Sequence, residues 1–361
     1  MSSNALERAH AFCARFGVRA PVLLAPMAGV AAPALSVAVA QAGGLGGCGA
    51  LMLQPHQIAE WVQQVRQQLP ADRHGAFQLN LWIPDPPPRR DPAHEGRVRE
   101  FLSHWGPAVP AEAGDAALPP FAAQCEALLA AHPRVVSSIM GLYPPDFAAE
   151  LRQRGISWFA AVSTVAEARA AQSAGADVIV AQGMEAGGHR ACFDAARAER
   201  QQVGLFALLP AVVDAVGVPV VAAGGIADAR GVAAALLLGA SAVQIGTAFL
   251  RCPEAGIDPV WAQALARTAA EDTAVTRAFS GRAGRCIEND YVRAVRAEGD
   301  AVIAPYPVQR GLSAAMRADA RKHADLQHMQ AWAGQSASLA KSEPAAALVQ
   351  LLWEGAQRLL A

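Results

Sequence analysis

The stretch VPVVAAGGIADARGVAAALLLGASAVQIGT, residues 218–247, decides the fold class. It opens with a short apolar run at 218–223, continues through an alanine- and leucine-rich segment at 229–238, and ends in a second apolar run at 242–245. Short apolar runs bounded by turn residues are typical of strands that are buried on both faces, and the segment between them is long enough for a helix. The stretch therefore predicts two parallel strands joined by a helix.

The same pattern recurs along the chain. The predicted strands comprise residues 22–25, 45–50, 77–81, 135–140, 158–162, 178–181, 218–223 and 242–245. The predicted helices between them comprise residues 33–41, 57–68, 145–154, 165–173, 205–216 and 229–238. Repeated units of this kind favour a closed (β/α)8 TIM barrel in the α/β class, with a doubly wound open sheet as the alternative.

Two parts of the chain lie outside this repeat. We place the barrel domain at residues 1–255, with a proline-rich excursion at 83–120. Residues 256–335 predict an appended region of helices and loops, and residues 336–361 predict a C-terminal helix that packs on the barrel. Long insertions on a barrel commonly serve as lids or binding loops, so we expect the appended region on the substrate side.

Composition and charge limit the class of protein. The chain has 361 residues, 53% of them hydrophobic and 17% charged, and 30 Lys+Arg nearly balance 31 Asp+Glu. These values argue against a disordered chain and against a nucleic-acid-binding protein. Residues 20–59 and 231–250 contain no Asp, Glu, Lys or Arg, but proline or glycine residues interrupt both runs. We therefore interpret them as buried barrel elements and expect no membrane span.

The N-terminus and the cysteines indicate the compartment. Residues 1–16 carry charges and lack the continuous apolar core of a secretory signal. The six cysteines are scattered without a C-x-x-C pair or a metal-type spacing. We therefore expect a cytoplasmic protein without a metal site. We also expect either a monomer or a homodimer.

Glycines follow the last two predicted strands. Gly224 and Gly225 come after the seventh strand, and the run Gln244-Ile245-Gly246-Thr247 ends the eighth. Phosphate groups are often bound at these two strand ends in barrels, where glycine lets backbone N–H groups approach the phosphate oxygens. The pattern predicts a ligand that carries a phosphate; the alternative is that the glycines serve only tight turns.

The densest polar cluster follows the sixth strand, in the sequence QGMEAGGHR at 182–190. A loop with three glycines that carries Gln, Glu, His and Arg is poorly explained by packing. Histidine is suited to proton transfer near neutral pH, so His189 is the candidate catalytic residue. Asn80 and Gln182 carry amides that can donate and accept hydrogen bonds at the edge of a cofactor.

These motifs together resemble a known family, the FMN-dependent nitronate monooxygenases of the bacterial class I type, formerly called 2-nitropropane dioxygenases. The resemblance covers about residues 21–289. It rests on APMAG at 25–29, AGGLG at 42–46, NL at 80–81, AQGMEAGGHR at 181–190, AAGGI at 222–226, QIGT at 244–247 and SGR at 280–282.

The resemblance implies an FMN barrel and a catalytic His189. The residues that it places on the flavin or its phosphate are Pro26, Met27, Asn80, Gln182, Gly187, Gly225, Gln244, Ile245, Gly246 and Thr247. Gly224 is a further cofactor-binding candidate. The implied reaction is the oxidation of alkyl nitronates, such as propionate 3-nitronate, by O2 to a carbonyl compound and nitrite. His189 would either act as a base on a neutral nitroalkane or, when protonated, stabilise the bound nitronate.

The sequence departs from the family pattern at two points. Ala191 stands where the family usually has glycine, and Ser137-Ser138-Ile139-Met140-Gly141 replaces an aromatic-rich end of the fourth strand. Both departures bear on the choice of substrate. Two alternatives to a nitronate monooxygenase also stay open: an FMN-dependent enoyl-ACP reductase that uses NAD(P)H, and a non-catalytic barrel that binds a phosphorylated ligand. Arg282 and Arg285 are weaker candidates for binding a substrate carboxylate.

Overall fold

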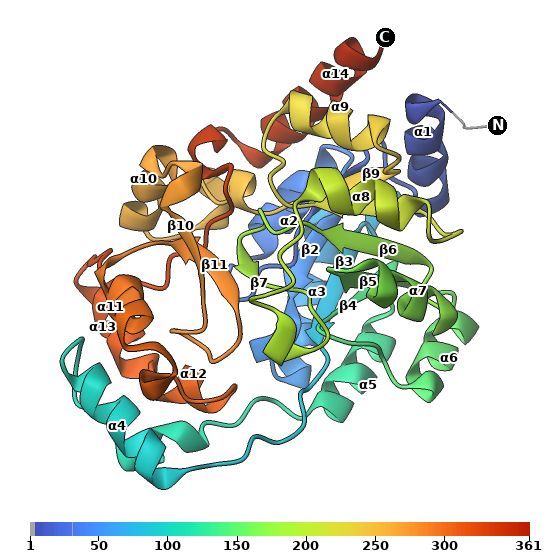
Figure 1. Ribbon diagram of the computed structural model, residues 1–361. Helices are drawn as coiled ribbons and strands as arrows, with labels where there is room; N and C mark the ends of the chain where they lie inside the picture. The colour runs from blue at the N-terminus through green and yellow to red at the C-terminus, as the bar shows by residue number, and fades with distance from the viewer. Residues whose placement is uncertain (1–3, 31) are drawn as a thin grey trace.

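A barrel of parallel strands forms the centre of the molecule, seen in a computed structural model that describes residues 4–30 and 32–361 (Figure 1). Residues 1–3 and 31, which fall within the predicted barrel domain, lie outside the described residues. The barrel strands are β1 (Val22–Leu24), β2 (Gly46–Gly49), β3 (Phe77–Trp82), β4 (Val135–Ile139), β5 (Ser157–Val162), β6 (Val178–Gln182), β8 (Val220–Ala223) and β9 (Ala242–Ile245).

Strand pairing closes this sheet. The order is β1-β9-β8-β6-β5-β4-β3-β2, and a parallel bridge between Leu23 and Leu45 joins the two edge strands. The Leu24 amide donates to the Leu45 carbonyl at 2.8 Å, and the Leu45 amide donates to the Val22 carbonyl at 3.1 Å. The predicted TIM barrel is therefore confirmed, and all its predicted strands are present with small shifts at their ends.

Helices cover the outside of the barrel (Figure 1). They are α2 (Pro33–Gln41), α3 (Pro55–Gln68), α5 (Phe121–Ala131), α6 (Pro145–Gln153), α7 (Val165–Ser173), α8 (Leu205–Val213) and α9 (Ala229–Leu237). The C-terminal helix α14 (Ala345–Leu360) lies against α9 and α2. Within the described residues, no helix is both long and apolar enough to cross a membrane.

An N-terminal helix that was not expected from the sequence blocks one end of the barrel. Helix α1 (Ala5–Phe16) begins with a capping box formed by Asn4 and Glu7. Its Phe12 and Phe16 rings pack 6.2 and 5.0 Å from the ring of Phe159, a residue of β5 inside the barrel. Because apolar side chains fill this end, we expect a ligand to enter from the opposite end, at the carboxyl ends of the strands.

The appended region forms a separate lobe beside that open end (Figure 1). It contains α10 (Pro259–Arg267), β10 (Thr273–Thr276), β11 (Gly284–Ile287), α11 (Asp290–Glu298), α12 (Val308–Leu312) and α13 (Ala314–Lys322). Helix α4 (Pro92–Ser103) of the proline-rich excursion joins the same apolar core, where Val98 and Leu102 pack with Tyr291 and Val308.

The lobe also corrects one expectation, because it is more than helices and loops. Strand β11 pairs antiparallel with β10 on one side and with β7 (Gly188–His189) on the other. Residue Gly284 lies opposite His189, and Arg285 lies opposite Gly188. These strands are too short to show a clear alternation of apolar and polar residues, and they form only because distant segments of the chain meet.

Candidate active site

A cavity of about 330 Å³ opens at the end of the barrel where the strands terminate. Its volume falls in the range of sites for small ligands and cofactors. All the candidate site residues line it: Pro26, Met27, Asn80, Gln182, Gly187, His189, Gly224, Gly225, Gln244, Ile245, Gly246 and Thr247. The structure thus brings the set together, while the contact of these residues with a flavin stays a prediction.

One end of the cavity is formed by the glycine turns after β8 and β9. Gly224 and Gly225 have φ values of 110° and 69°, which favour glycine. A Cβ at Gly225 would lie 3.2 Å from the Cβ of Glu185, so the turn also has little space for a side chain. Thr247 accepts a hydrogen bond from the Gly334 amide at 3.0 Å, which leaves its own hydroxyl hydrogen to donate. This end suits a phosphate.

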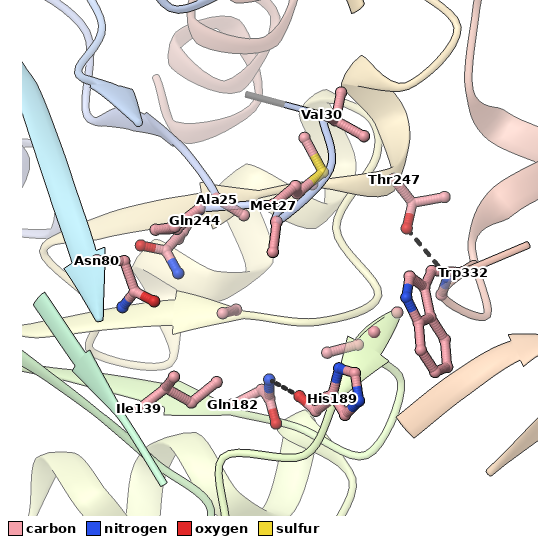
Figure 2. Close-up of a pocket in the computed structure, with 18 of the residues that line it drawn as sticks. Ala25, Met27, Val30, Asn80, Ile139, Gln182, His189, Gln244, Thr247 and Trp332 are labelled. Atoms are coloured by element: carbon pink, nitrogen blue, oxygen red, sulfur yellow. Dashed lines mark hydrogen bonds between the residues drawn. The ribbon is translucent and has the colours of Figure 1, made fainter. Parts of the chain in front are cut away.

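Two amide side chains line the opposite wall, and their partners orient them (Figure 2). The Asn80 Nδ2 donates to Ser137 Oγ at 3.0 Å, so the Asn80 Oδ1 is left to accept. The Gln244 Oε1 accepts from Gln78 Nε2 at 3.1 Å, so the Gln244 Nε2 is left to donate. The wall therefore offers one acceptor and one donor to a ligand with both kinds of group at its edge.

Gln182 holds the loop that follows β6. Its Oε1 accepts from the Ala191 amide at 2.8 Å and from Arg190 Nη1 at 3.1 Å. Its Nε2 donates to the His189 carbonyl at 3.0 Å. Most of the hydrogen-bonding capacity of Gln182 is thus used to hold residues 189–191 of this loop. The Ala191 departure leaves this arrangement intact because only its backbone N–H takes part.

His189 lies at the edge of the three-stranded sheet, between two tryptophans. Its ring centroid is 4.5 Å from that of Trp82 and 4.7 Å from that of Trp332. The His189 Nε2 lies 2.7 Å from Ser280 Oγ, and the Ser280 hydroxyl donates to the Arg282 carbonyl at 3.1 Å. Figure 2 shows His189 and Trp332 facing each other beside the cavity. Within the described residues Nδ1 forms no hydrogen bond, so this ring nitrogen is the one available to a substrate.

The surroundings of His189 keep its imidazole neutral. Burial, followed by the positive charges of Arg282, Arg310 and Arg317, lowers the pKa of His189 from 6.5 to about 3. Near neutral pH the free protein therefore holds an uncharged imidazole. The lowered pKa argues against a protonated His189 as the group that stabilises a bound nitronate.

This shift predicts a pH-dependent stability. Because the folded pKa lies below the unfolded value of 6.5, the unfolded chain takes up a proton as the pH falls through 6.5 and the folded chain does not. We expect the free energy of unfolding of the wild type, relative to His189→Asn, to fall by about 1 kcal/mol between pH 6.5 and about pH 5.5. Urea unfolding of both proteins at the two pH values measures the difference. An unchanged difference would show that the folded and unfolded chains take up this proton alike, so that the pKa of His189 is not lowered by folding.

A segment near the C-terminus closes the cavity over the His189 loop. The Gly334 amide binds Thr247, and the Gln335 amide donates to the Glu185 carbonyl at 2.9 Å. A Cβ on Gly187 would lie 2.5 Å from the Gly334 nitrogen, so glycine is required there for close approach of the two backbones. This contact joins two parts of the chain that are far apart in sequence.

Several cavity residues lie beyond the sequence-based prediction. They are Trp82, Trp261, Trp332 and the arginines Arg310, Arg317 and Arg321. Arg282 and Arg285, the weaker candidates for a substrate carboxylate, do not line the cavity. Arg282 donates to the Cys192 carbonyl and pairs with Asp85 at 3.4 Å, and Arg285 donates to the Met184 carbonyl. In the part of the chain that the structure describes, no group of three His, Cys, Asp or Glu could hold a metal ion.

Comparison with known proteins places this geometry in a family. A sequence model of the family described as nitronate monooxygenase matches residues 10–355. A nitronate monooxygenase of Paraburkholderia phytofirmans is 38% identical over 342 residues, which cover 93% of this chain and 92% of that protein. The chain belongs to the nitronate monooxygenase family. It is therefore an oxidoreductase of a flavin-dependent family that oxidises nitronates.

Solved structures agree with this family. A nitroalkane oxidase from Streptomyces ansochromogenes has a TM-score of 0.85 and 33% identity, and the match covers 96% of this chain and all of that one. FabK from Thermotoga maritima has a TM-score of 0.74 and 26% identity, with 96% of each chain covered. Membership in the nitronate monooxygenase family therefore has the better support, and the enoyl-ACP reductase alternative is the more distant one.

Proposed function

We propose that the chain binds FMN in this cavity and uses O2 to oxidise alkyl nitronates to a carbonyl compound and nitrite. The observation that carries the proposal is that one cavity joins a phosphate-type glycine turn at Gly224 and Gly225, two oriented amides and a half-buried histidine. FMN has one phosphate and a ring edge with both donors and acceptors, which match these groups. The flavin supplies the electron acceptor and the reactivity with O2.

Some of these residues would bind the cofactor, and His189 would contact the substrate. The backbone N–H groups of the turns after β8 and β9 and the Thr247 hydroxyl would hold the phosphate. The free Asn80 Oδ1 and Gln244 Nε2 would meet the ring edge. Trp82, Trp332 and Ser280 would fix the ring of His189 so that Nδ1 faces the substrate.

The neutral state of His189 favours nitronates over neutral nitroalkanes. A base with a pKa of about 3 has little driving force for removing a proton from carbon near neutral pH. A nitronate already lacks that proton, so its oxidation does not depend on a strong base at this position. We therefore propose that the chain acts on nitronates that form before they reach this site. We also propose a cytoplasmic location, because its six free cysteines are buried and would stay reduced there.

The proposal is tested by an absorbance spectrum of the purified protein and then by turnover assays with propyl nitronate. Purified protein should show flavin absorbance, acid release should yield FMN, and anaerobic propyl nitronate should change the flavin spectrum. In air, propyl nitronate should be consumed with O2 and give nitrite, much faster than neutral nitropropane. A protein that takes up no flavin would support the non-catalytic barrel. Steady NADPH oxidation with a crotonyl thioester, without nitronate turnover, would support the enoyl-ACP reductase.

A further inference from the structure

A second hollow, of about 380 Å³, lies at the other end of the barrel, where the strands begin. Its lining residues are Arg15, Phe16, Gly75, His132, Pro133, Arg134, Gly155 and Ser157. Arg134 directly precedes β4, Ser157 is the first residue of β5, and Arg15 lies in the last turn of α1. Residues at this end of a TIM barrel usually serve stability, so a ligand here would be separate from the reacting centre.

Positive charge predominates in this hollow. Arg15 and Arg134 line it, and within the described residues no Asp or Glu does. Asp177 pairs with Arg15 at 3.3 Å but also accepts from the Trp158 amide at 2.9 Å. Arg134 forms one hydrogen bond in the described part of the chain, from Nη1 to the Phe16 carbonyl at 2.9 Å. The Nε and Nη2 atoms of Arg134 are therefore available to a ligand.

Packing fixes the Arg134 side chain before a ligand binds. A Cβ on Gly17 would overlap Arg134 Nη1, and a Cβ on Gly75 would lie 3.5 Å from Arg134 Nε. The side chain thus passes beside two glycines that leave room for it, with its guanidinium against the end of α1. A guanidinium that is already held in place loses less conformational entropy when it binds an anion.

His132 and Ser157 add two further donors. Within the described residues, the His132 ring and the Ser157 hydroxyl form no hydrogen bond, and both residues line the hollow. His132 has a φ of 47°, a left-handed conformation that is costly for a residue with a side chain. Arg66 Nη2 donates to the Ala131 carbonyl at 2.8 Å and to the His132 carbonyl at 3.1 Å. These bonds keep His132 at the rim of the hollow.

Two more arginines extend the positive charge around this site. Arg73 and Arg19 donate to backbone carbonyls at 3.0 and 2.8 Å, and in the described part of the chain neither has an ion pair with a carboxylate. Burial lowers the pKa of Arg73, and the charges of Arg19 and Arg134 lower it further while Asp72 opposes them. The arginines are thus close enough to repel one another, and an anion bound beside Arg134 would reduce this repulsion.

We propose that this hollow binds a small phosphorylated anion, with Arg134 and Arg15 on the phosphoryl oxygens and His132 and Ser157 as further donors. Guanidinium groups match phosphoryl oxygens through paired N–H···O bonds. The volume of the hollow suits a small molecule. Since the glycine turns after β8 and β9 lie at the opposite end of the barrel, this anion is distinct from the phosphate of a cofactor. Its binding to the folded state alone stabilises the protein.

The site is tested by calorimetric titration with pyrophosphate at constant ionic strength, on protein saturated with FMN. The wild type should bind one pyrophosphate per chain, and the same site should keep its Kd when FMN is omitted. Arg134→Gln should raise this Kd roughly tenfold or more, the usual size of a lost hydrogen bond to a charged group. The melting temperature of the wild type should rise with pyrophosphate concentration, and that of Arg134→Gln should rise much less.

Arg169→Gln is the matched control, because it removes an exposed arginine of α7 that does not line the hollow. It should bind pyrophosphate as the wild type does. Arg15→Gln is the second variant, since Arg134 also binds the Phe16 carbonyl and its loss could impair folding. Arg15 is exposed on α1, so its replacement should leave the protein folded while it raises the Kd.

Three results would overturn the proposal. The first is a wild type that does not bind pyrophosphate, or arginine variants that bind it with unchanged Kd. The second is competition between FMN and pyrophosphate, which would assign the anion to the cofactor site. The third is binding of anionic lipid vesicles or single-stranded DNA that depends on Arg134, without binding of pyrophosphate, which would assign the hollow to a macromolecular surface. Nitronate oxidation is measured separately, so the proposed function stands or fails independently of these results.

Discussion

Replacing His189 by Asn should reduce kcat for nitronate oxidation by roughly 10²- to 10⁴-fold, the range for loss of a positioned proton-transfer or hydrogen-bonding side chain. The imidazole is held by Ser280 at 2.7 Å and between Trp82 and Trp332, so its Nδ1 has a defined position beside the cavity. An asparagine is shorter and leaves that position empty. Stopped-flow measurement of the flavin spectrum after anaerobic mixing with propyl nitronate isolates the affected step.

The matched control is His104→Asn, since His104 is exposed at the end of α4 and does not line the cavity. It should behave like the wild type. In His189→Asn the loss should lie in kcat rather than in flavin content, because the turns and amides that would bind FMN are separate from the imidazole. A variant that turns over within a factor of about three of the wild type would remove His189 from the reaction.

Replacing Gly187 by Ala should weaken flavin binding strongly. The new Cβ would lie 2.5 Å from the Gly334 nitrogen, 2.7 Å from the Ala333 carbonyl carbon and 2.9 Å from Thr247 Oγ1. Two backbones would have to separate, with loss of the Gly334–Thr247 and Gln335–Glu185 hydrogen bonds. At about 1 kcal/mol each, these bonds correspond to a roughly 30-fold rise in the Kd for FMN. Fluorescence titration of the flavin-free protein measures this Kd.

Gly217→Ala serves as the control for the general effect of replacing glycine. A Cβ at Gly217 would meet its nearest neighbour, Gln172 Oε1, at 3.8 Å, an ordinary contact. This variant should bind FMN as the wild type does, with stability equal or slightly higher because alanine restricts the unfolded chain. Wild-type affinity in Gly187→Ala would mean that the segment around Gly334 does not contribute to the cofactor site.

The barrel and the strand ends that line its cavity could be predicted from the local sequence pattern. Helices α2 and α7 and strand β9 have the predicted bounds, and the other predicted barrel elements differ only at their ends. The reason is physical: a strand buried on both faces must be apolar along its length, and a strand end that approaches a ligand closely needs glycine. Both requirements act on neighbouring residues, so they leave a readable pattern. The family motifs added the assignment of His189.

The appended lobe was harder to predict from the sequence. Its short strands β10 and β11 carry little periodic signal, and β11 forms a sheet with the His189 loop, nearly a hundred residues earlier in the chain, with Gly284 opposite His189. The contact of Ser280 with His189 and the position of Trp332 depend on that pairing. The arginines gave no sequence signal of their own, because an arginine in a cavity and one on the surface look alike along a chain.

The amino-acid sequence by itself thus determined the barrel, the strand ends that line its open end and the candidate residues there, because these depend on burial and backbone freedom over a few neighbouring positions. Only the tertiary structure decided the charge environment of the reacting centre. The lowered pKa of His189 and the placement of Arg310 and Arg317 in the cavity wall arise where the lobe folds over the barrel. Electrostatic energies depend on distance and burial in space, which separation along the chain does not specify.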